Sequence, residues 1–361
     1  MISDASGCAE AYSKMHELFA LPSSESLDEP WLLELWKRPL RLFSLANVLR
    51  QKSCGNNVSF VINRNINFTN RCAGSCSFCA FHESNGYTLS GEEILNRVQE
   101  AELLGATEIC LQGGLAPEMV LEDYCAILEL IRRNYPRMHL HAYSPMEILH
   151  MSRNSSIHVE EALKELKTSG LDSIPGTAAE ILVDSVRQQI CPGKLSTVQW
   201  CDIITSAHRL GIPTTSTMLY GHIESLSDRL NHIRVIRDIQ AKTSGFTEFV
   251  LLPFLPGKNR LGQVSRTPDI LEHLKMSALS RVALYPYITN IQASWPKLGR
   301  FVAGASIEWG INDLGGTLME ENISRSAGSK ETQYISPDEL KYIIEKHGRN
   351  AVQRTTLYSY L

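Results

Sequence analysis

Three cysteines on one short stretch carry the clearest chemistry in this sequence. Cys72, Cys76 and Cys79 stand in a C-x3-C-x2-C pattern within residues 70–82. Three thiolates on one loop can each bind one iron of a 4Fe-4S cluster, and the fourth iron then stays open to another ligand. An open iron indicates catalysis rather than simple electron transfer. The alternative is a non-catalytic zinc site, because His82 completes a possible Cys3His set.

A second group of candidates follows other strand-like segments. Gly113 and Gly114 come directly after the strand-like stretch 107–112. Without side chains, their backbone carbonyls can be reached by an ammonium group of a ligand, although the same pair is also typical of a tight turn. Glu180 follows a Pro-Gly pair and could bind a ribose diol or an amine, or could simply favour a helix N-terminus.

Polar side chains near the remaining strand ends are candidate catalytic or substrate-binding groups. His141 lies nearer the end of its strand than His139, which favours it of the two, although a strand histidine is more often structural. The catalytic candidates are His141, Tyr220 and Asp313. The substrate-binding candidates are His222, Asn312, Asp313 and Arg325. Arg325 could equally be a solvated surface arginine.

An alternation of strands and helices must position these residues. Apolar residues alternate from Phe60 to Phe68, which predicts a first strand. Further strands are expected near residues 107–112, 139–143, 171–173, 214–220, 246–252, 288–293 and 311–314, with helices between them. This order implies right-handed crossovers and a parallel sheet, and about seven or eight such units fit a closed TIM-type α/β barrel. Loops after barrel strands form the mouth where ligands bind.

Residues 1–55 are predicted to form an N-terminal helical cap, because apolar residues recur there at helical spacing between prolines. Residues 56–361 are then the barrel with a C-terminal extension. The six cysteines outside the cluster pattern are scattered, which favours small buried residues over a disulfide framework.

Composition excludes several classes of partner. The 361 residues carry 35 basic and 39 acidic side chains, a net charge of -4. No basic excess is available for nucleic acid or an anionic membrane. No apolar run is long enough to span a bilayer, and the first twenty residues include Asp4, Glu10 and Lys14, unlike a secretory signal. We therefore expect a cytoplasmic protein with neither a membrane nor a nucleic acid as partner.

The cysteine pattern after a first barrel strand resembles the signature of radical S-adenosylmethionine (SAM) enzymes. Six further stretches together resemble one family, the second subunit of FO synthase, a tyrosine 4-hydroxyphenyl transferase of deazaflavin biosynthesis. These stretches are residues 67–70, 79–82, 175–180, 218–222, 312–320 and 353–358. The resemblance runs from about Ser59 to Tyr358. The sequence departs from the family pattern at Ala116 and over 252–266.

The resemblance implies a 4Fe-4S cluster bound by the three cysteines, and SAM held by Gly113, Gly114 and Glu180. The resulting 5'-deoxyadenosyl radical would take hydrogen from L-tyrosine, whose Cα–Cβ bond breaks to leave 2-iminoacetate. The 4-hydroxybenzyl fragment would then join C5 of 5-amino-6-(D-ribitylamino)uracil, with methionine and 5'-deoxyadenosine also released. An electron donor and a partner radical SAM subunit that closes the deazaflavin ring are implied as well.

Two related menaquinone-pathway enzymes are the alternative within the superfamily, aminofutalosine synthase and dehypoxanthine futalosine cyclase. The stretch Pro175 to Glu180 disfavours them, because the pattern that marks those two enzymes has three glycines before Ala-Glu at this place.

Overall fold

The strands of this chain form one parallel barrel. The computed structural model describes residues 28–361 except 82, 84, 85, 258, 264–267, 321, 327, 332 and 333. The strands are β1 (Asn57–Val61), β2 (Asn63–Ile66), β3 (Glu108–Leu111), β4 (His139–Ala142), β5 (Thr214–Tyr220), β6 (Phe246–Pro253), β7 (Ile291–Ala293), β8 (Asp313–Gly316) and β9 (Asn350–Gln353). All ladders between these strands are parallel.

The strand order closes the predicted TIM-type barrel. Strands β2, β3 and β4 are neighbours, and the order β5, β6, β7, β8, β1 completes the circuit. The predicted fourth strand, 171–173, is reduced to two isolated bridges, from Ser173 to β4 and from Ile174 to β5. Pro175 follows at once and cannot donate a ladder hydrogen bond, which explains why this strand is so short.

The first strand is divided at Ile62, and its two halves have different neighbours. β1 pairs with β8 on one side and with β9 on the other, whereas β2 pairs with β3. β9 was not predicted from the sequence. It carries the C-terminal residues after Gln353 to the base of the barrel.

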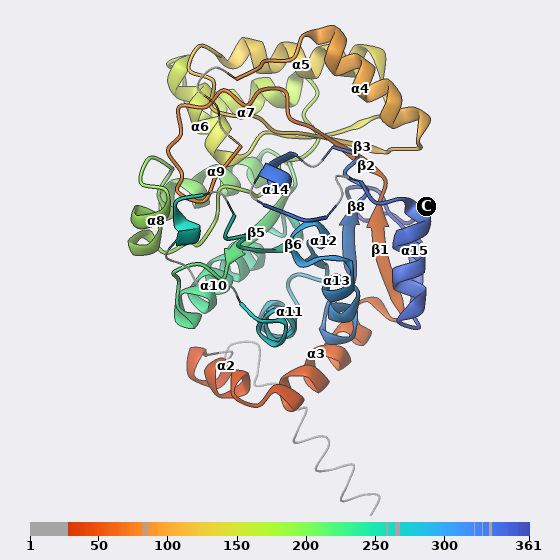
Figure 1. Ribbon diagram of the computed structural model, residues 1–361. Coiled ribbons are helices and arrows are strands. Elements are labelled where there is room, and N and C mark those ends of the chain that lie inside the picture. The colour runs from red at the N-terminus through yellow and green to blue at the C-terminus, as the bar shows by residue number, and fades with distance from the viewer. Residues whose placement is uncertain are drawn as a thin grey trace, which may run out of the picture.

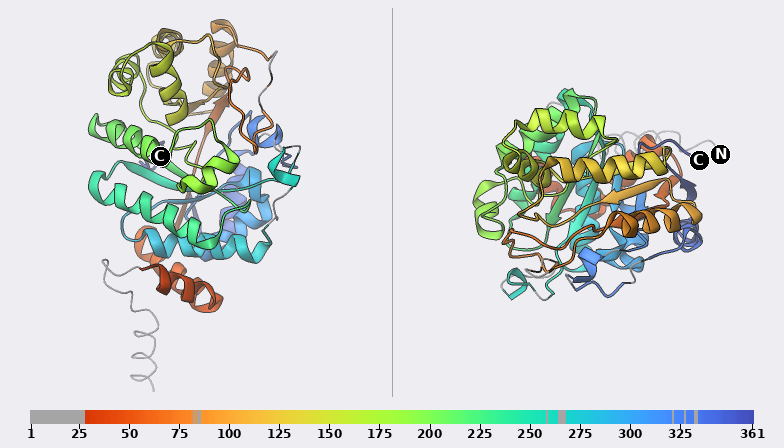
Figure 2. Two further views of the ribbon diagram at one scale, coloured as in Figure 1. Left: turned by 90° about the vertical axis from the view of Figure 1, so that its left-hand side faces the viewer. Right: turned by 90° about the horizontal axis from the view of Figure 1, so that it is seen from above.

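Helices surround the strands (Figures 1 and 2). They are α2 (Glu29–Trp36), α3 (Pro39–Cys54), α4 (Gly91–Leu103), α5 (Leu121–Asn134), α6 (Pro145–Asn154), α7 (Val159–Thr168), α8 (Asp184–Ile190), α9 (Thr197–Arg209), α10 (Leu226–Thr243), α11 (Ile270–Leu284), α12 (Trp295–Leu298), α13 (Arg300–Ser306), α14 (Asn322–Ser326) and α15 (Pro337–Lys346), with short 3-10 turns at Leu261–Gln263 and Ile307–Trp309.

Helix α6 was not predicted, although the sequence carries a signal for it. The Ser144 hydroxyl accepts from the Glu147 N–H, and the Glu147 carboxylate accepts from the Ser144 N–H. The pair forms a capping box, with Pro145 in the first turn.

Helices α2 and α3 lie beside α11 at the end of the barrel where β1 begins (Figure 1). Leu42, Leu45 and Leu49 of α3 belong to the same buried apolar cluster as the barrel residues. The described part of the predicted 1–55 cap therefore shares one core with the barrel, and residues 1–27 lie outside the described residues. No helix among the described residues is long and apolar enough to cross a membrane.

Candidate active site

A cavity of about 400 Å³ lies inside the barrel. Its lining includes seven of the residues predicted from sequence: Cys72, Cys76, Cys79, Gly113, Gly114, His141 and Glu180. The cysteines follow the carboxyl end of β2, so they mark the mouth of the cavity. Residues near the starts of β2, β3 and β6 line its deep end.

The cysteine loop has no regular secondary structure and is braced by neighbouring segments. The Ala73 N–H donates to Leu115 O at 2.9 Å, and the Ser77 N–H donates to Ile190 O at 2.8 Å. Ser77 O in turn accepts from the Leu261 N–H at 3.0 Å. Bonds to three different segments hold the loop's backbone, and so its thiols, in place without any metal.

The surroundings of the three thiols bear on how they could bind a metal. The Gly74 N–H donates to Cys72 Sγ at 3.3 Å. Burial raises the pKa of Cys76, while the Lys194 ammonium acts in the opposite direction. Among the described residues no three His, Cys, Asp or Glu side chains converge as a mononuclear metal requires. A 4Fe-4S cube takes each thiolate to a different iron, and the zinc candidate His82 lies outside the described residues.

Gly113 and Gly114 are required by close packing against the cysteine loop. A Cβ on Gly114 would lie 2.2 Å from Arg71 O, and one on Gly113 would lie 2.5 Å from the Phe68 ring. The Gly114 N–H also donates to Thr69 O at 2.8 Å. Glycine therefore lets the cysteine loop and the loop after β3 lie against each other at the mouth.

Glu180 lies in a strained loop and forms an ion pair with Lys194. Its φ of 44° is in the left-handed region that side chains disfavour. The buried Arg187 guanidinium donates to backbone carbonyls of this loop, among them Ala178 O at 3.2 Å and Ala179 O. Lys194 Nζ lies 2.7 Å from Glu180 Oε1, and both side chains line the cavity. An ion pair on the wall can receive both donors and acceptors of a polar ligand.

Glu147 was missed by sequence reasoning. Its carboxylate accepts from the Gly113 N–H at 3.0 Å and from the Ser144 N–H at 2.6 Å, and it lines the cavity beside the glycine pair. Burial raises the pKa of Glu147 to about 6. The capping-box pattern that predicts α6 would also have located this carboxylate.

His141 lies in the cavity wall and is neutral near pH 7, because burial lowers its pKa to about 4. Its Nδ1 lies 2.7 Å from Ser173 Oγ, which is also 2.7 Å from Nε2 of His139. A hydroxyl donates one hydrogen, so at least one of the two rings must donate to it. Glu108, also missed, lines the cavity and accepts from Asn63 Nδ2 at 2.8 Å.

Five predicted residues do not line the cavity: Tyr220, His222, Asn312, Asp313 and Arg325. Thr215, Thr217 and Leu219 face inward from β5, so Tyr220 faces outward, where its hydroxyl lies 2.8 Å from His273 Nδ1. The sequence placed Tyr220 at the correct end of the strand, but it could not show which alternate side chains of the strand face the cavity.

Three of the other four are held in internal polar contacts. His222 Nδ1 lies 3.0 Å from Glu224 Oε2, and Asn312 Oδ1 accepts from Arg281 Nη2 at 2.6 Å. Asp313 is fully buried against Arg354. The fourth, Arg325, is exposed on α14.

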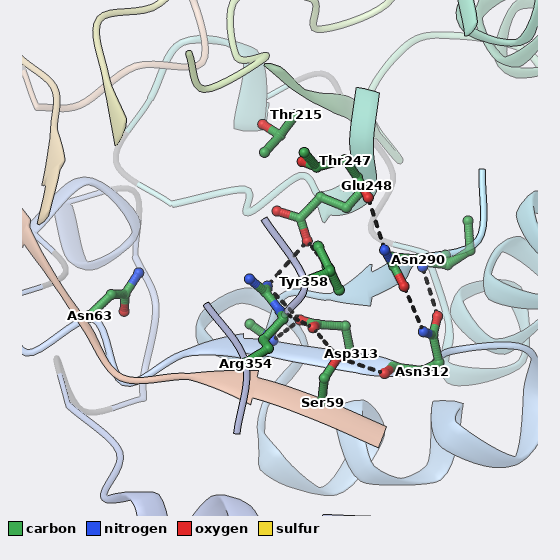
Figure 3. Close-up of polar contacts among 12 residues, drawn as sticks. Ser59, Asn63, Thr215, Thr247, Glu248, Asn290, Asn312, Asp313, Arg354 and Tyr358 are labelled. Carbon is green, nitrogen blue, oxygen red and sulfur yellow. Dashed lines mark hydrogen bonds and ion pairs between the residues drawn. The ribbon is translucent and has the colours of Figure 1, made fainter. Parts of the chain in front are cut away.

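The base of the cavity is a network that joins three parts of the chain (Figure 3). Arg354, just after β9, donates through Nε to Asp313 Oδ2 at 2.5 Å and through Nη2 to Asp313 Oδ1 at 3.1 Å. The same Nη2 lies 3.3 Å from Glu248 Oε2 on β6, which also accepts from the Tyr358 hydroxyl. Burial raises the pKa of Glu248 to about 7, although Arg354 acts in the opposite direction.

Two family models together span most of the chain. The model described as the radical SAM superfamily matches residues 66–236, and the CofH/MqnC C-terminal region matches residues 243–361. A Methanosarcina mazei protein named 5-amino-6-(D-ribitylamino)uracil–L-tyrosine 4-hydroxyphenyl transferase 1 is 52% identical over 336 residues, covering 91% of this chain and 89% of that protein. The Archaeoglobus fulgidus protein with the same transferase name is 49% identical, covering 91% of this chain and 96% of that protein.

This chain belongs to that transferase family. The chain is thus a radical SAM enzyme, and the resemblance inferred from the motifs is confirmed. Enzymes of the superfamily use a 4Fe-4S cluster and SAM.

Solved structures support the fold. Methylornithine synthase matches with a TM-score of 0.70 at 18% identity, covering 94% of this chain and 93% of that chain. The FeFe-hydrogenase maturase HydG from Carboxydothermus hydrogenoformans matches with a TM-score of 0.68 at 15% identity, covering 98% of this chain and 80% of that chain. At this identity the likeness concerns the barrel alone.

Proposed function

We propose that this chain transfers the 4-hydroxybenzyl fragment of L-tyrosine to C5 of 5-amino-6-(D-ribitylamino)uracil in the biosynthesis of deazaflavin FO, releasing 2-iminoacetate. The observation that carries the proposal is that the three cysteines, the glycine pair and the polar residues at the base all line the same cavity. A volume of about 400 Å³ suits small-molecule substrates. The relatives' names supply the substrates.

Cys72, Cys76 and Cys79 are the proposed ligands of the 4Fe-4S cluster. Gly113, Gly114 and Glu180 are the proposed contacts to SAM, to which we add Lys194, the ion-pair partner of Glu180. When bound, the cluster and SAM supply a 5'-deoxyadenosyl radical, which requires an electron donor. A second radical SAM subunit would close the deazaflavin ring.

The chain's own residues prepare this site in two ways. The braced cysteine loop and the glycine pair fix the mouth, so the substrates and cofactors are held in a set geometry. Apolar side chains such as Phe254, Leu219 and Leu314 line the cavity and would limit the access of water to reactive intermediates.

The test is an anaerobic assay on cluster-reconstituted protein with SAM, a reductant, L-tyrosine and the aminouracil. Mass spectrometry should detect 5'-deoxyadenosine and the coupled adduct. A parallel reaction with a futalosine nucleoside should give no product. Deoxyadenosine formed with the futalosine nucleoside, and no adduct with tyrosine, would favour the menaquinone-pathway reaction and overturn the proposal.

A further inference from the structure

The deep end of the cavity presents polar side chains that the proposed chemistry does not use. We call the set Asn63, Glu108, His141, Glu248 and Arg354 the barrel floor; all five line the cavity and all are buried. They come from β2, β3, β4, β6 and the segment after β9. Five separate elements thus place polar groups in one cavity, below the cysteine loop that follows the carboxyl end of β2.

The cation of the floor is already neutralised. Arg354 makes a two-point contact with Asp313 and a third contact with Glu248 (Figure 3). Asp313 also accepts from the Ser59 hydroxyl at 2.5 Å and from the Gly315 N–H at 2.6 Å, so it is fixed behind Arg354. With two carboxylates against it, Arg354 has little attraction left for an anionic ligand.

Acceptor atoms of the floor remain available. In Figure 3 one oxygen of Glu248 meets Arg354 and Tyr358, and no described residue donates to the other oxygen. His141 uses Nδ1 for Ser173, which leaves Nε2 without a hydrogen bond from the described residues; Nε2 is an acceptor in the tautomer in which Nδ1 donates to Ser173. Glu108 adds a second carboxylate, held by Asn63. Buried acceptors that face a cavity are costly unless water or a ligand supplies donors, and a ligand with several O–H groups can replace such water.

This pattern selects between the two substrates of the proposed function, on which the inference rests. The floor is rich in acceptors and has no unneutralised arginine, so it suits a neutral ligand with many O–H donors. Tyrosine bound by its amino-acid end would bring its carboxylate next to Glu108 and Glu248, because its ammonium and carboxylate are attached to one carbon. Like charges in a buried site repel. Tyrosine bound by its phenol end would supply a single O–H donor for the several acceptors of the floor. The aminouracil carries a chain of hydroxyls and no carboxylate.

We propose that the barrel floor binds the ribityl hydroxyls of the aminouracil, with Glu248 and Glu108 as the main acceptors. The pyrimidine ring is then directed from the floor toward the cysteine end, where C5 must meet the tyrosine fragment. Glu248 and Glu108 are thus specificity-determining residues for the polyol chain and take no part in the chemical step.

The test compares Glu248→Gln and Glu108→Gln with wild type in the complete anaerobic reaction. Each variant keeps the side-chain shape but replaces one carboxyl oxygen that can accept with an amide NH2 that cannot. KM for the aminouracil should therefore rise about tenfold, which corresponds to a loss of about 1.4 kcal/mol. KM for L-tyrosine and kcat should change by less than about twofold. Glu272→Gln is the matched control, because Glu272 pairs with Arg229 outside the cavity and its replacement should change neither KM.

A second substrate keeps the test decisive if a variant fails to load its cluster. Wild type should bind 5-amino-6-(methylamino)uracil, which lacks the hydroxyls, at least about 100-fold more weakly than the ribityl compound by calorimetry. A rise in the tyrosine KM instead, or equal binding of the two uracils, would overturn the floor assignment while leaving the transferase intact. Absence of any adduct from wild type would overturn the proposed function and the inference with it.

Discussion

At the scale of single residues, chemistry here depends on side chains whose surroundings oppose their charge. Cys76 is half-buried and Glu147 is buried beside the mouth, and loss of solvent raises the pKa of both groups. Glu248 is buried at the floor with the same effect. Groups of this kind cost stability and cluster at functional sites.

The cluster assignment predicts a sharp difference among the cysteines. Replacing Cys72, Cys76 or Cys79 with alanine, one at a time, should abolish SAM cleavage, because each thiolate would hold a separate iron. Cys125→Ala should retain it, since Cys125 lies on α5 outside the cavity lining. Production of 5'-deoxyadenosine and iron content are the measurements. SAM cleavage retained by all three single variants would contradict the assignment.

The raised pKa of Glu248 predicts that the stability of the fold depends on pH. Its pKa is about 7 in the folded chain against an ordinary 4.5, so the folded state gives up the proton later than the unfolded state does. Stability is therefore lost as pH rises from about 4.5 to 7, by up to about 3 kcal/mol. Glu248→Gln removes this loss, so its Tm relative to wild type should rise between pH 5 and pH 8 in anaerobic melts. A difference in Tm that does not change with pH would exclude the raised pKa.

At the scale of elements, the mouth depends on loops that pack without side chains. A Cβ on Gly114 would clash with the cysteine loop backbone at Arg71, whereas one on Gly193 would meet only Ser75 Oγ, at 3.9 Å. Gly114→Ala should therefore displace the cysteine loop and lower the iron content of the reconstituted protein at least about twofold. Gly193→Ala should keep a normal iron content. Equal iron content in both variants would show that the glycine contact does not position the cluster loop.

The sequence predicted the elements that local patterns define. The barrel, most of its helices and the cysteine loop followed from periodicity and spacing, and the glycine pair was placed correctly beside the cavity. The inward or outward parity of a strand end is not a local property. For that reason Tyr220 and Asp313 were proposed as site residues although they do not line the cavity.

The missed residues owe their place to distant pairing. Arg354 reaches the floor because β9 lies beside β1, a contact between positions nearly three hundred residues apart that no local pattern encodes. Glu108 and Glu248 face the cavity through the register of β3 and β6 in the closed barrel. Only the capping box of Glu147 was readable in the sequence itself.

At the scale of the whole molecule, the first and last strands of the described chain lie side by side in the barrel. β1 is the first strand and β9 the last, and they pair over four residues from Asn57↔Asn350 to Phe60↔Gln353. The segment after β9 then places Arg354 between two buried carboxylates. Arg354 and Thr356 of the C-terminal segment are therefore part of the cavity lining.

Removing residues 354–361 should destabilise the whole molecule. Asp313 and Glu248 would be left buried without Arg354, which typically costs about 3–5 kcal/mol. Removing Leu361 alone, which is 69% exposed, should have little effect. Thermal melting and soluble yield of the two truncated chains are the measurements. Similar Tm values for both chains would show that the floor network contributes little to stability.

The central claim is that the tyrosine side chain is cut at Cα–Cβ and passed to the aminouracil within one cavity. The most direct measurement uses L-tyrosine labelled with ¹³C either at Cβ and the ring or at Cα and the carboxyl carbon, with mass spectrometry of the adduct. The account predicts that the adduct gains the mass of the Cβ and ring label and none of the Cα and carboxyl label. An adduct that carries the Cα label, or deoxyadenosine formed without any labelled adduct, would contradict it.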